Sequence, residues 1–116
     1  MKRRVAVFGA DMFWSSCPYE ALDVYQEISM FEKTDMILFQ DDIRLNRVFK
    51  GEEKFFFEKE KYQKLENLRV ISTWSDFFKI SKEYTHIFCS SKFYPKTRMV
   101  KIPENVFDRM IFWDVG

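Results

Sequence analysis

The sequence predicts an α/β domain built on one doubly wound parallel sheet of about five strands, in the spatial order 3-2-1-4-5. Two observations carry this prediction. Short apolar segments recur along the chain, and charged segments with helical spacing separate them. Residues 4–8 are apolar after their first position, as expected of a strand that is buried on both faces of a parallel sheet. Winding in both directions from the first strand places that strand near the centre.

The elements follow in order along the chain. We expect a helix over residues 18–31, because Pro18 suits the first helical position and Ser16 or Cys17 can cap it. Apolar residues recur there at helical spacing, which predicts an inner face of Ala21, Val24, Tyr25, Ile28 and Phe31. The remaining strands are expected at residues 36–39, 68–71, 86–89 and 110–113. Further helices are expected at residues 52–66 and 75–84, and at most one helical turn within 103–109. Residues 43–51 fit neither the strand pattern nor the helix pattern.

Length and composition limit the classes of protein. The 116 residues suit a single domain spanning residues 1–116. With 19 basic and 18 acidic residues the net charge is +1, which gives no global electrostatic reason to bind nucleic acid. No apolar run approaches the roughly 18 residues of a membrane span, and the one after the basic start is too short for a signal peptide. With two cysteines, a disulfide is conceivable, but a reducing, cytoplasmic setting is the better expectation.

The carboxyl ends of the predicted strands are where a ligand is expected, because open parallel sheets bind ligands outside those ends. Serine hydroxyls and backbone N–H groups at the start of the first helix suit a phosphate or sugar hydroxyl. Acids that follow strands can accept hydrogen bonds from a polyol. The alternative is structural: Ser16 caps the helix, the aromatic residues pack on the sheet, and Asp41 lies in a solvated turn. The predicted ligand-binding residues are Gly9, Asp11, Phe13, Trp14, Ser15, Ser16, Asp41, Ser90, Ser91 and Asp114.

No residue is assigned a catalytic role. Glycine-rich phosphate-binding motifs are missing, since only Gly9 stands where a dinucleotide motif needs three glycines. Cys17 at a helix start would have a lowered pKa, but a nucleophile also needs a base, and the lone His86 is more often structural. One histidine and two distant cysteines do not supply a zinc site, so neither a metal nor another cofactor is predicted.

Residues 5–9, 85–91 and 110–114 carry a resemblance. Each is an apolar strand that ends in glycine, serine or aspartate, and together they resemble the Rossmann-like N-terminal half of glycosyltransferases of the GT-B class. The likeness is architectural. It implies a domain that binds a sugar or polyol acceptor, while a second domain or a partner chain binds the nucleotide-sugar donor. Such a chain is expected to be inactive alone, and is either the front of a longer protein or one half of a complex.

Two other functions stay open. An aromatic surface formed by Phe13, Trp14, Phe93 and Tyr94 would suit a stand-alone binding or inhibitor protein. A small nucleotide-binding regulator is the other possibility. Exposed aromatic side chains would favour the first function, and a bound nucleotide would favour the second.

Overall fold

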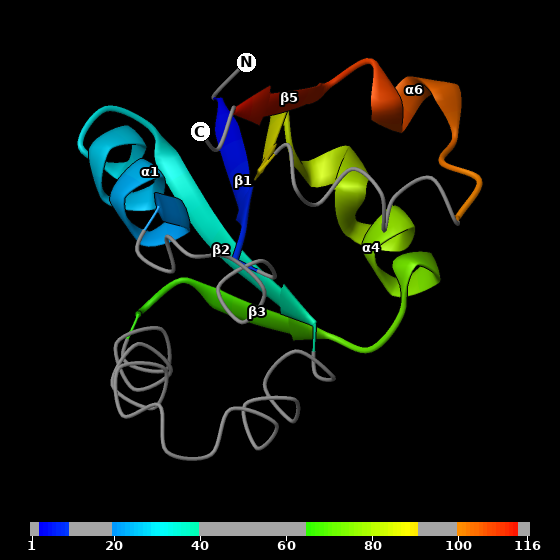
Figure 1. Cartoon of the computed structure of the whole chain (residues 1–116), viewed down its shortest axis with the longest axis horizontal. Helices are drawn as coiled ribbons and strands as arrows, with labels where there is room; N and C mark the ends of the chain where they lie inside the picture. The colour runs from blue at the N-terminus through cyan, green and yellow to red at the C-terminus, as the bar shows by residue number, and fades with distance from the viewer. Residues whose placement is uncertain (1–2, 10–19, 40–64, 91–99, 114–116) are drawn as a thin grey trace.

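A computed structural model describes residues 3–9, 20–39, 65–90 and 100–113 of the chain (Figure 1). It contains a five-stranded sheet in the order β3-β2-β1-β4-β5, as predicted from the sequence. Every pairing between neighbouring strands is parallel. The elements are β1 (Arg4–Phe8), α1 (Glu20–Ser29), β2 (Lys33–Phe39), β3 (Leu68–Ile71), α4 (Trp74–Ile80), η3 (Ser81–Glu83), β4 (His86–Ser90), α6 (Glu104–Phe107) and β5 (Met110–Trp113).

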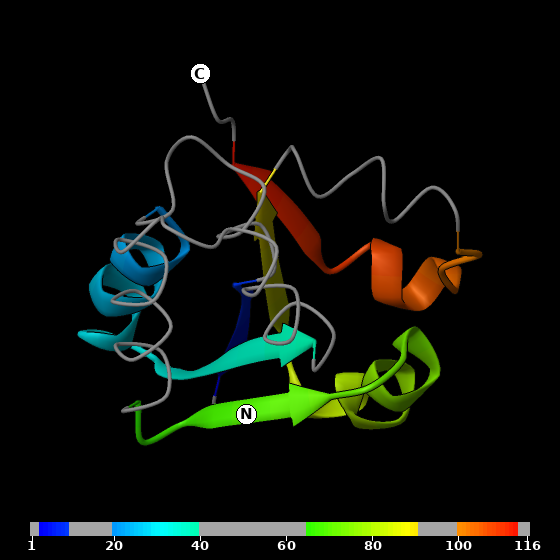
Figure 2. The ribbon, with the colours of Figure 1, turned by 60° about the horizontal axis from the view of Figure 1, so that its bottom comes forward.

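The first strand is the centre of the sheet. Val7 on β1 lies opposite Met36 on β2 and opposite Phe88 on β4. Because this central strand is also packed on both faces, Val5 to Phe8 are at most 3% exposed and the segment has almost no polar residues. Figures 1 and 2 show α1 on one side of the sheet and α4 and α6 on the other.

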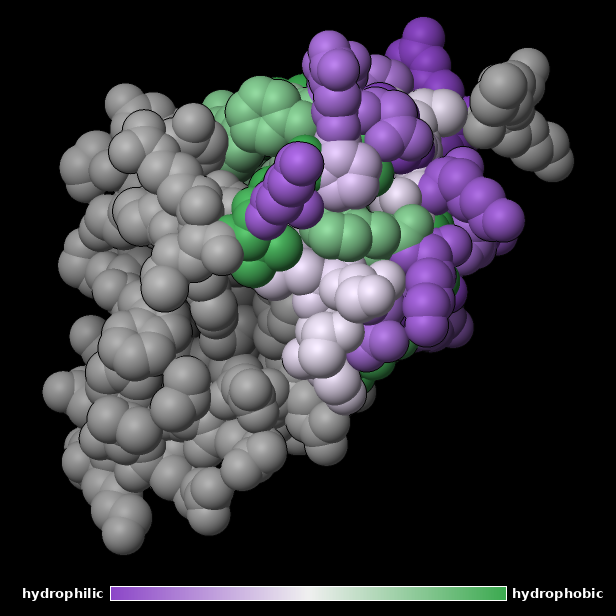
Figure 3. Space-filling view, turned by 90° about the vertical axis from the view of Figure 1, so that its right-hand side faces the viewer, coloured by the Kyte–Doolittle hydropathy of each residue, from purple (hydrophilic) through white to green (hydrophobic). Residues whose placement is uncertain are grey.

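An aromatic cluster fills the side covered by α4 and α6. The Phe8 ring lies 4.7 Å from that of Phe77 and 5.4 Å from that of Trp74, between ring centroids. Tyr84 stacks on Phe77 at 6.4 Å. Phe77 is fully buried, so these contacts form a close-packed core around it. Figure 3, which views this side, shows mostly hydrophilic side chains over the described surface, with apolar atoms in a band between them.

The opposite side of the sheet has a largely aliphatic core. Alternation along β1 turns Val5 and Val7 toward α1, where they belong to one cluster with Ala21, Leu22 and Tyr25. Val24 and Ile28 are only partly buried, and Leu22 is more buried than the sequence pattern predicted.

The helix predicted to end at residue 31 ends at Ser29. The N–H groups of Phe31 and Glu32 both donate to the Ile28 carbonyl, which turns the chain away from the helix axis. Phe31, predicted on the inner face, is 79% exposed. The prediction for Phe31 was therefore wrong, because the chain leaves the helical spacing before that residue.

Two further boundaries differ from the expectation. β2 starts at Lys33 rather than at residue 36, because its first polar residues still pair with β1. The helix expected over 75–84 is α4 followed by the 3-10 turn η3. α4 starts in a capping box: the Asp76 N–H donates to Thr73 Oγ1, and the Thr73 N–H donates to Asp76 Oδ2, each at 3.2 Å. Most of the helix expected at 52–66 lies outside the described residues, and its last residues, 65 and 66, are not helical.

Within the described part of the chain, no helix has the length and apolar character needed to cross a membrane.

Candidate functional site

The carboxyl edge of the sheet, where the strands end, contains a topological switch point. From β1 the chain builds β2 and β3 to one side, and then returns to build β4 and β5 on the other. The next described helix after β1 is α1, on one side of the sheet, and the next after β4 is α6, on the other (Figures 1 and 2). Open α/β sheets bind ligands at such a switch point. Gly9 follows β1, and Ser90 is the last residue of β4.

Gly9 is held firmly at this edge. It is buried, and its N–H donates to the Ile37 carbonyl at 2.9 Å, which extends the pairing of β1 with β2 by one residue. The register pairs Val7 with Phe88, so Gly9 and Ser90 each come two residues after a directly paired position. The structure thus brings these two predicted site residues to adjacent strand ends.

The other predicted ligand-binding residues lie outside the described residues. Two of them follow strands that end at the same edge: β2 ends at Phe39, before Asp41, and β5 ends at Trp113, before Asp114. The predicted ligand-binding residues outside the described ranges are Asp11, Phe13, Trp14, Ser15, Ser16, Asp41, Ser91 and Asp114. Cys17, Phe93 and Tyr94, which are candidates for other roles, also lie outside the described ranges.

The lone histidine lies at the other end of the strands. His86 is the first residue of β4, half-buried, and its Nδ1 is 2.9 Å from the hydroxyl oxygen of Thr85. This position is at the amino edge of the sheet, where the strands begin, away from the predicted site. Cys89 is fully buried in the core on the α4 side. Among the described residues, no group of three or more His, Cys, Asp or Glu side chains is placed to hold a metal ion.

A buried carboxylate organises the amino edge. Asp35 on β2 is 2% exposed, and three donors converge on its Oδ2. Arg4 donates from Nε at 3.1 Å and from Nη2 at 2.7 Å, and the Tyr84 hydroxyl donates at 2.7 Å. A charged group is stable at this depth only when a counter-charge and hydrogen bonds compensate it, and both are present.

Glu83 and Arg69 complete this arrangement, which we call the Asp35 network: Arg4, Asp35, Arg69, Glu83 and Tyr84. The Glu83 carboxylate accepts from Arg4 at 3.0 Å and from Arg69 at 3.1 Å, and Arg69 also donates to the Tyr84 hydroxyl at 3.0 Å. Both guanidinium groups lie over the Tyr84 ring, 5.5 and 6.0 Å from its centroid. Burial and the hydrogen bond to Asp35 raise the pKa of Tyr84 well above its usual value, although Arg69 opposes this shift.

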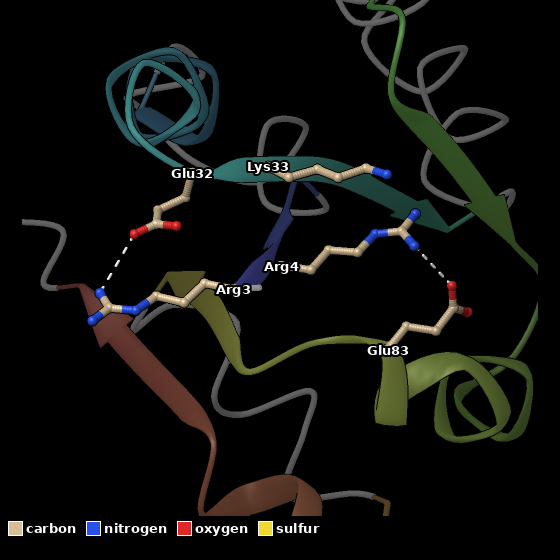
Figure 4. Close-up of a pocket in the computed structure, with 5 residues that line it drawn as sticks. All are labelled: Arg3, Arg4, Glu32, Lys33 and Glu83. Carbon is tan, nitrogen blue, oxygen red and sulfur yellow. Dashed lines mark hydrogen bonds and ion pairs between the residues drawn. The ribbon is translucent and has the colours of Figure 1, made fainter. Parts of the chain in front are cut away.

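An open hollow of about 490 Å³ lies at the surface beside the Asp35 network. Arg3 and Glu32 form a long ion pair on one side of it, at 3.4 Å, and Arg4 and Glu83 lie on the other (Figure 4). The Lys33 side chain extends between them, toward the Arg4 guanidinium. We call this the amino-edge hollow; its lining residues are Arg3, Arg4, Glu32, Lys33 and Glu83.

Sequence reasoning missed both features of the amino edge. The apolar run predicts a second strand that starts at Met36, so Asp35 falls outside the predicted strand. One signal was available: Arg4, Asp35 and Arg69 each stand directly before, or within, a short apolar run. A parallel sheet aligns the starts of its strands, so charges in these positions meet at one edge.

No known protein family, curated protein or solved structure matches this chain.

Proposed function

We propose that this chain is a ligand-binding α/β domain that takes a sugar or another polyol at the carboxyl edge, beside the ends of β1 and β4. In this proposal it acts as the acceptor-side domain of a GT-B-like glycosyltransferase. The donor nucleotide-sugar is held by a different domain or by a partner chain, and the described domain does not transfer sugar alone.

The strand order carries the proposal. An order of β3-β2-β1-β4-β5 creates the switch point between β1 and β4, and Gly9 and Ser90 stand at the two strand ends beside it. The segments that continue from these strands supply hydroxyls, carboxylates and aromatic rings in the sequence. This mixture suits a polyol, whose hydroxyls need polar partners and whose C–H face packs on an aromatic ring.

The direct test is sugar binding by the purified chain, with a panel of glucose, galactose, mannose, N-acetylglucosamine and ribitol as probes. For whichever probe binds, Trp14→Ala and Asp11→Asn should each weaken binding by about 1–3 kcal/mol, the usual effect of losing a buried contact or hydrogen bond. Phe31→Ala and Asp108→Asn are matched controls, because both side chains are exposed and lie away from the carboxyl edge. Equal binding by all four variants would contradict the proposal.

A second candidate function, binding to a protein partner, is favoured by one observation. Met30 and Phe31 are 76% and 79% exposed in the turn between α1 and β2. Adjacent large apolar side chains at that exposure are a common feature of protein-binding surfaces. A Met30→Ser, Phe31→Ser double variant that folds normally and loses a co-purifying partner would support this function over sugar binding.

A further inference from the structure

Two cations lie directly opposite each other at the amino edge. The register of β1 and β2 pairs Arg4 with Lys33. Alternation along each strand turns both toward the α4 side, since Ala6 and Ile37 on the same strands belong to the core cluster there. Like charges at directly opposite positions on neighbouring strands are unfavourable unless something compensates them.

The two cations differ in how they are compensated. Arg4 forms ion pairs with Asp35 at 2.7 Å and with Glu83 at 3.0 Å. Lys33 is exposed, and no acid of residues 3–9, 20–39, 65–90 or 100–113 lies within 4.0 Å of its ammonium group. Both acids of the amino-edge hollow, Glu32 and Glu83, form ion pairs with arginines instead. Lys33 is therefore a cation without a counter-charge in the described part of the chain, and it extends over a hollow.

Arg4 also keeps donors for a ligand. A guanidinium group has five N–H bonds, and the bonds of Arg4 to Asp35 and Glu83 use three of them: Nε–H and one on each terminal nitrogen. The Asp35 network holds this guanidinium in place. A fixed guanidinium beside a free ammonium is an arrangement that binds an oxyanion, through charge-assisted hydrogen bonds from both.

We infer that the amino-edge hollow binds the oxyanion group of a small molecule, a phosphate or a carboxylate, between the ammonium group of Lys33 and the guanidinium of Arg4. The hollow, about 490 Å³, is larger than a bare ion, so it has room for an organic part beside the charged group. Glu32 and Glu83 stand at its edge and repel additional negative charge, which favours a ligand with one anionic group over a polyanion. This site lies at the opposite edge of the sheet from the proposed sugar site.

The experiment is a titration of the ¹⁵N-labelled chain with inorganic phosphate and, in a second arm, with acetate. The ionic strength is held constant with sodium chloride. We expect saturable shifts of the Arg4, Lys33 and Glu83 amide signals. Lys33→Met, which keeps the aliphatic stem, should weaken phosphate binding roughly tenfold, as expected for the loss of one charge-assisted hydrogen bond. Lys79→Met removes the same charge from an exposed position on α4 and should change binding less than about twofold.

Each outcome decides the inference. Binding of phosphate alone identifies a phosphate-bearing ligand, and binding of both probes identifies the oxyanion as the recognised group. No saturable shift with either probe, up to about 50 mM, would overturn the inference, because a Kd near 10 mM would already give most of the full shift there. If Lys33→Met and Lys79→Met weakened phosphate binding equally, the inference would also be overturned, because the anion would then be held by general charge attraction. Should Lys33→Met not fold, as judged by circular dichroism, Lys33→Gln takes its place with the same expectations.

Discussion

The two edges of the sheet differ in where their polar groups lie. At the amino edge the polar groups are inside the strands: Arg4 on β1 donates to Asp35 on β2, and the Asp35 carboxylate at the centre of the network is buried. At the carboxyl edge the described strands end in apolar or small residues, as at Phe8, Phe39 and Ser90, and polar residues follow them in the sequence. Charges fixed within strands stabilise the fold and hold a rigid surface, whereas groups on loops can vary with the ligand.

This difference predicts that changes at the amino edge act on stability. Asp35→Asn should have the largest effect, because it removes the carboxylate on which Arg4 and Tyr84 converge and leaves Arg4 with Glu83 as its counter-charge. We expect the free energy of unfolding to fall by about 2–4 kcal/mol, measured by urea denaturation.

The matched control is Asp108→Asn, an identical change at an exposed position just after α6. It should change stability by less than about 0.5 kcal/mol. Equal effects of the two variants would show that the Asp35 network does not stabilise the amino edge.

Tyr84→Phe should have the next largest effect. It should lower the free energy of unfolding by about 1–2 kcal/mol at pH 7, because Asp35 loses one of its hydrogen-bond donors. Tyr25→Phe is the control. The Tyr25 hydroxyl forms a hydrogen bond with the neutral side chain of Asn67, so we expect Tyr25→Phe to lower the free energy of unfolding by only about 0.5–1 kcal/mol.

The same tyrosine predicts an alkaline dependence. The pKa of Tyr84 is raised above 10.0, so the folded chain keeps this proton at a pH where the unfolded chain releases it. The associated stability is complete below about pH 10 and is lost as the pH rises toward the folded-state pKa. The decline in the urea midpoint above pH 10 should therefore be shallower in Tyr84→Phe than in the unmodified chain. An unchanged decline would contradict the assignment to Tyr84.

The smallest effect is expected at the carboxyl side. Thr73 caps α4 in the loop that follows β3, and Thr73→Ala removes one half of the capping box. Thr73→Ala should lower the free energy of unfolding by about 1 kcal/mol, measured by thermal or urea denaturation. Thr73→Ser keeps the hydroxyl and should change the free energy of unfolding by only about a few tenths of a kcal/mol. If Thr73→Ala destabilised the chain more than Asp35→Asn, the proposed difference between the edges would be wrong.

The fold could be predicted from the sequence because its signals are local. The run from Val5 to Phe8 is too short for a helix and too apolar for a surface strand, and β-α alternation then implies a parallel sheet. The Asp35 network could not be predicted, because it depends on the register that brings β1 and β2 together. A sequence shows an aspartate before an apolar run, but whether Arg4 reaches it is a matter of three-dimensional placement. The turn at Phe31 was missed for the same reason, since helical spacing continues past the point where the chain turns.

The positions of two candidate site residues could be predicted from the sequence. The switch-point rule needs only the strand order, so the placement of Gly9 and Ser90 at one edge followed from the topology. The amino-edge hollow has no sequence motif. Its lining comes from β1, β2, η3 and the residues beside them, and only the packing of these elements brings Lys33 and Glu83 to one surface.

The most direct test of the central claim, that the carboxyl edge is the ligand site, is an amide chemical-shift titration of the ¹⁵N-labelled chain with the sugar and polyol panel. If the claim holds, a binding sugar shifts the Gly9 and Ser90 signals in a saturable way and leaves those of Lys33 and Thr85, at the opposite edge, unchanged. A saturable response confined to Lys33 and Thr85, or no response to any member of the panel, would contradict it.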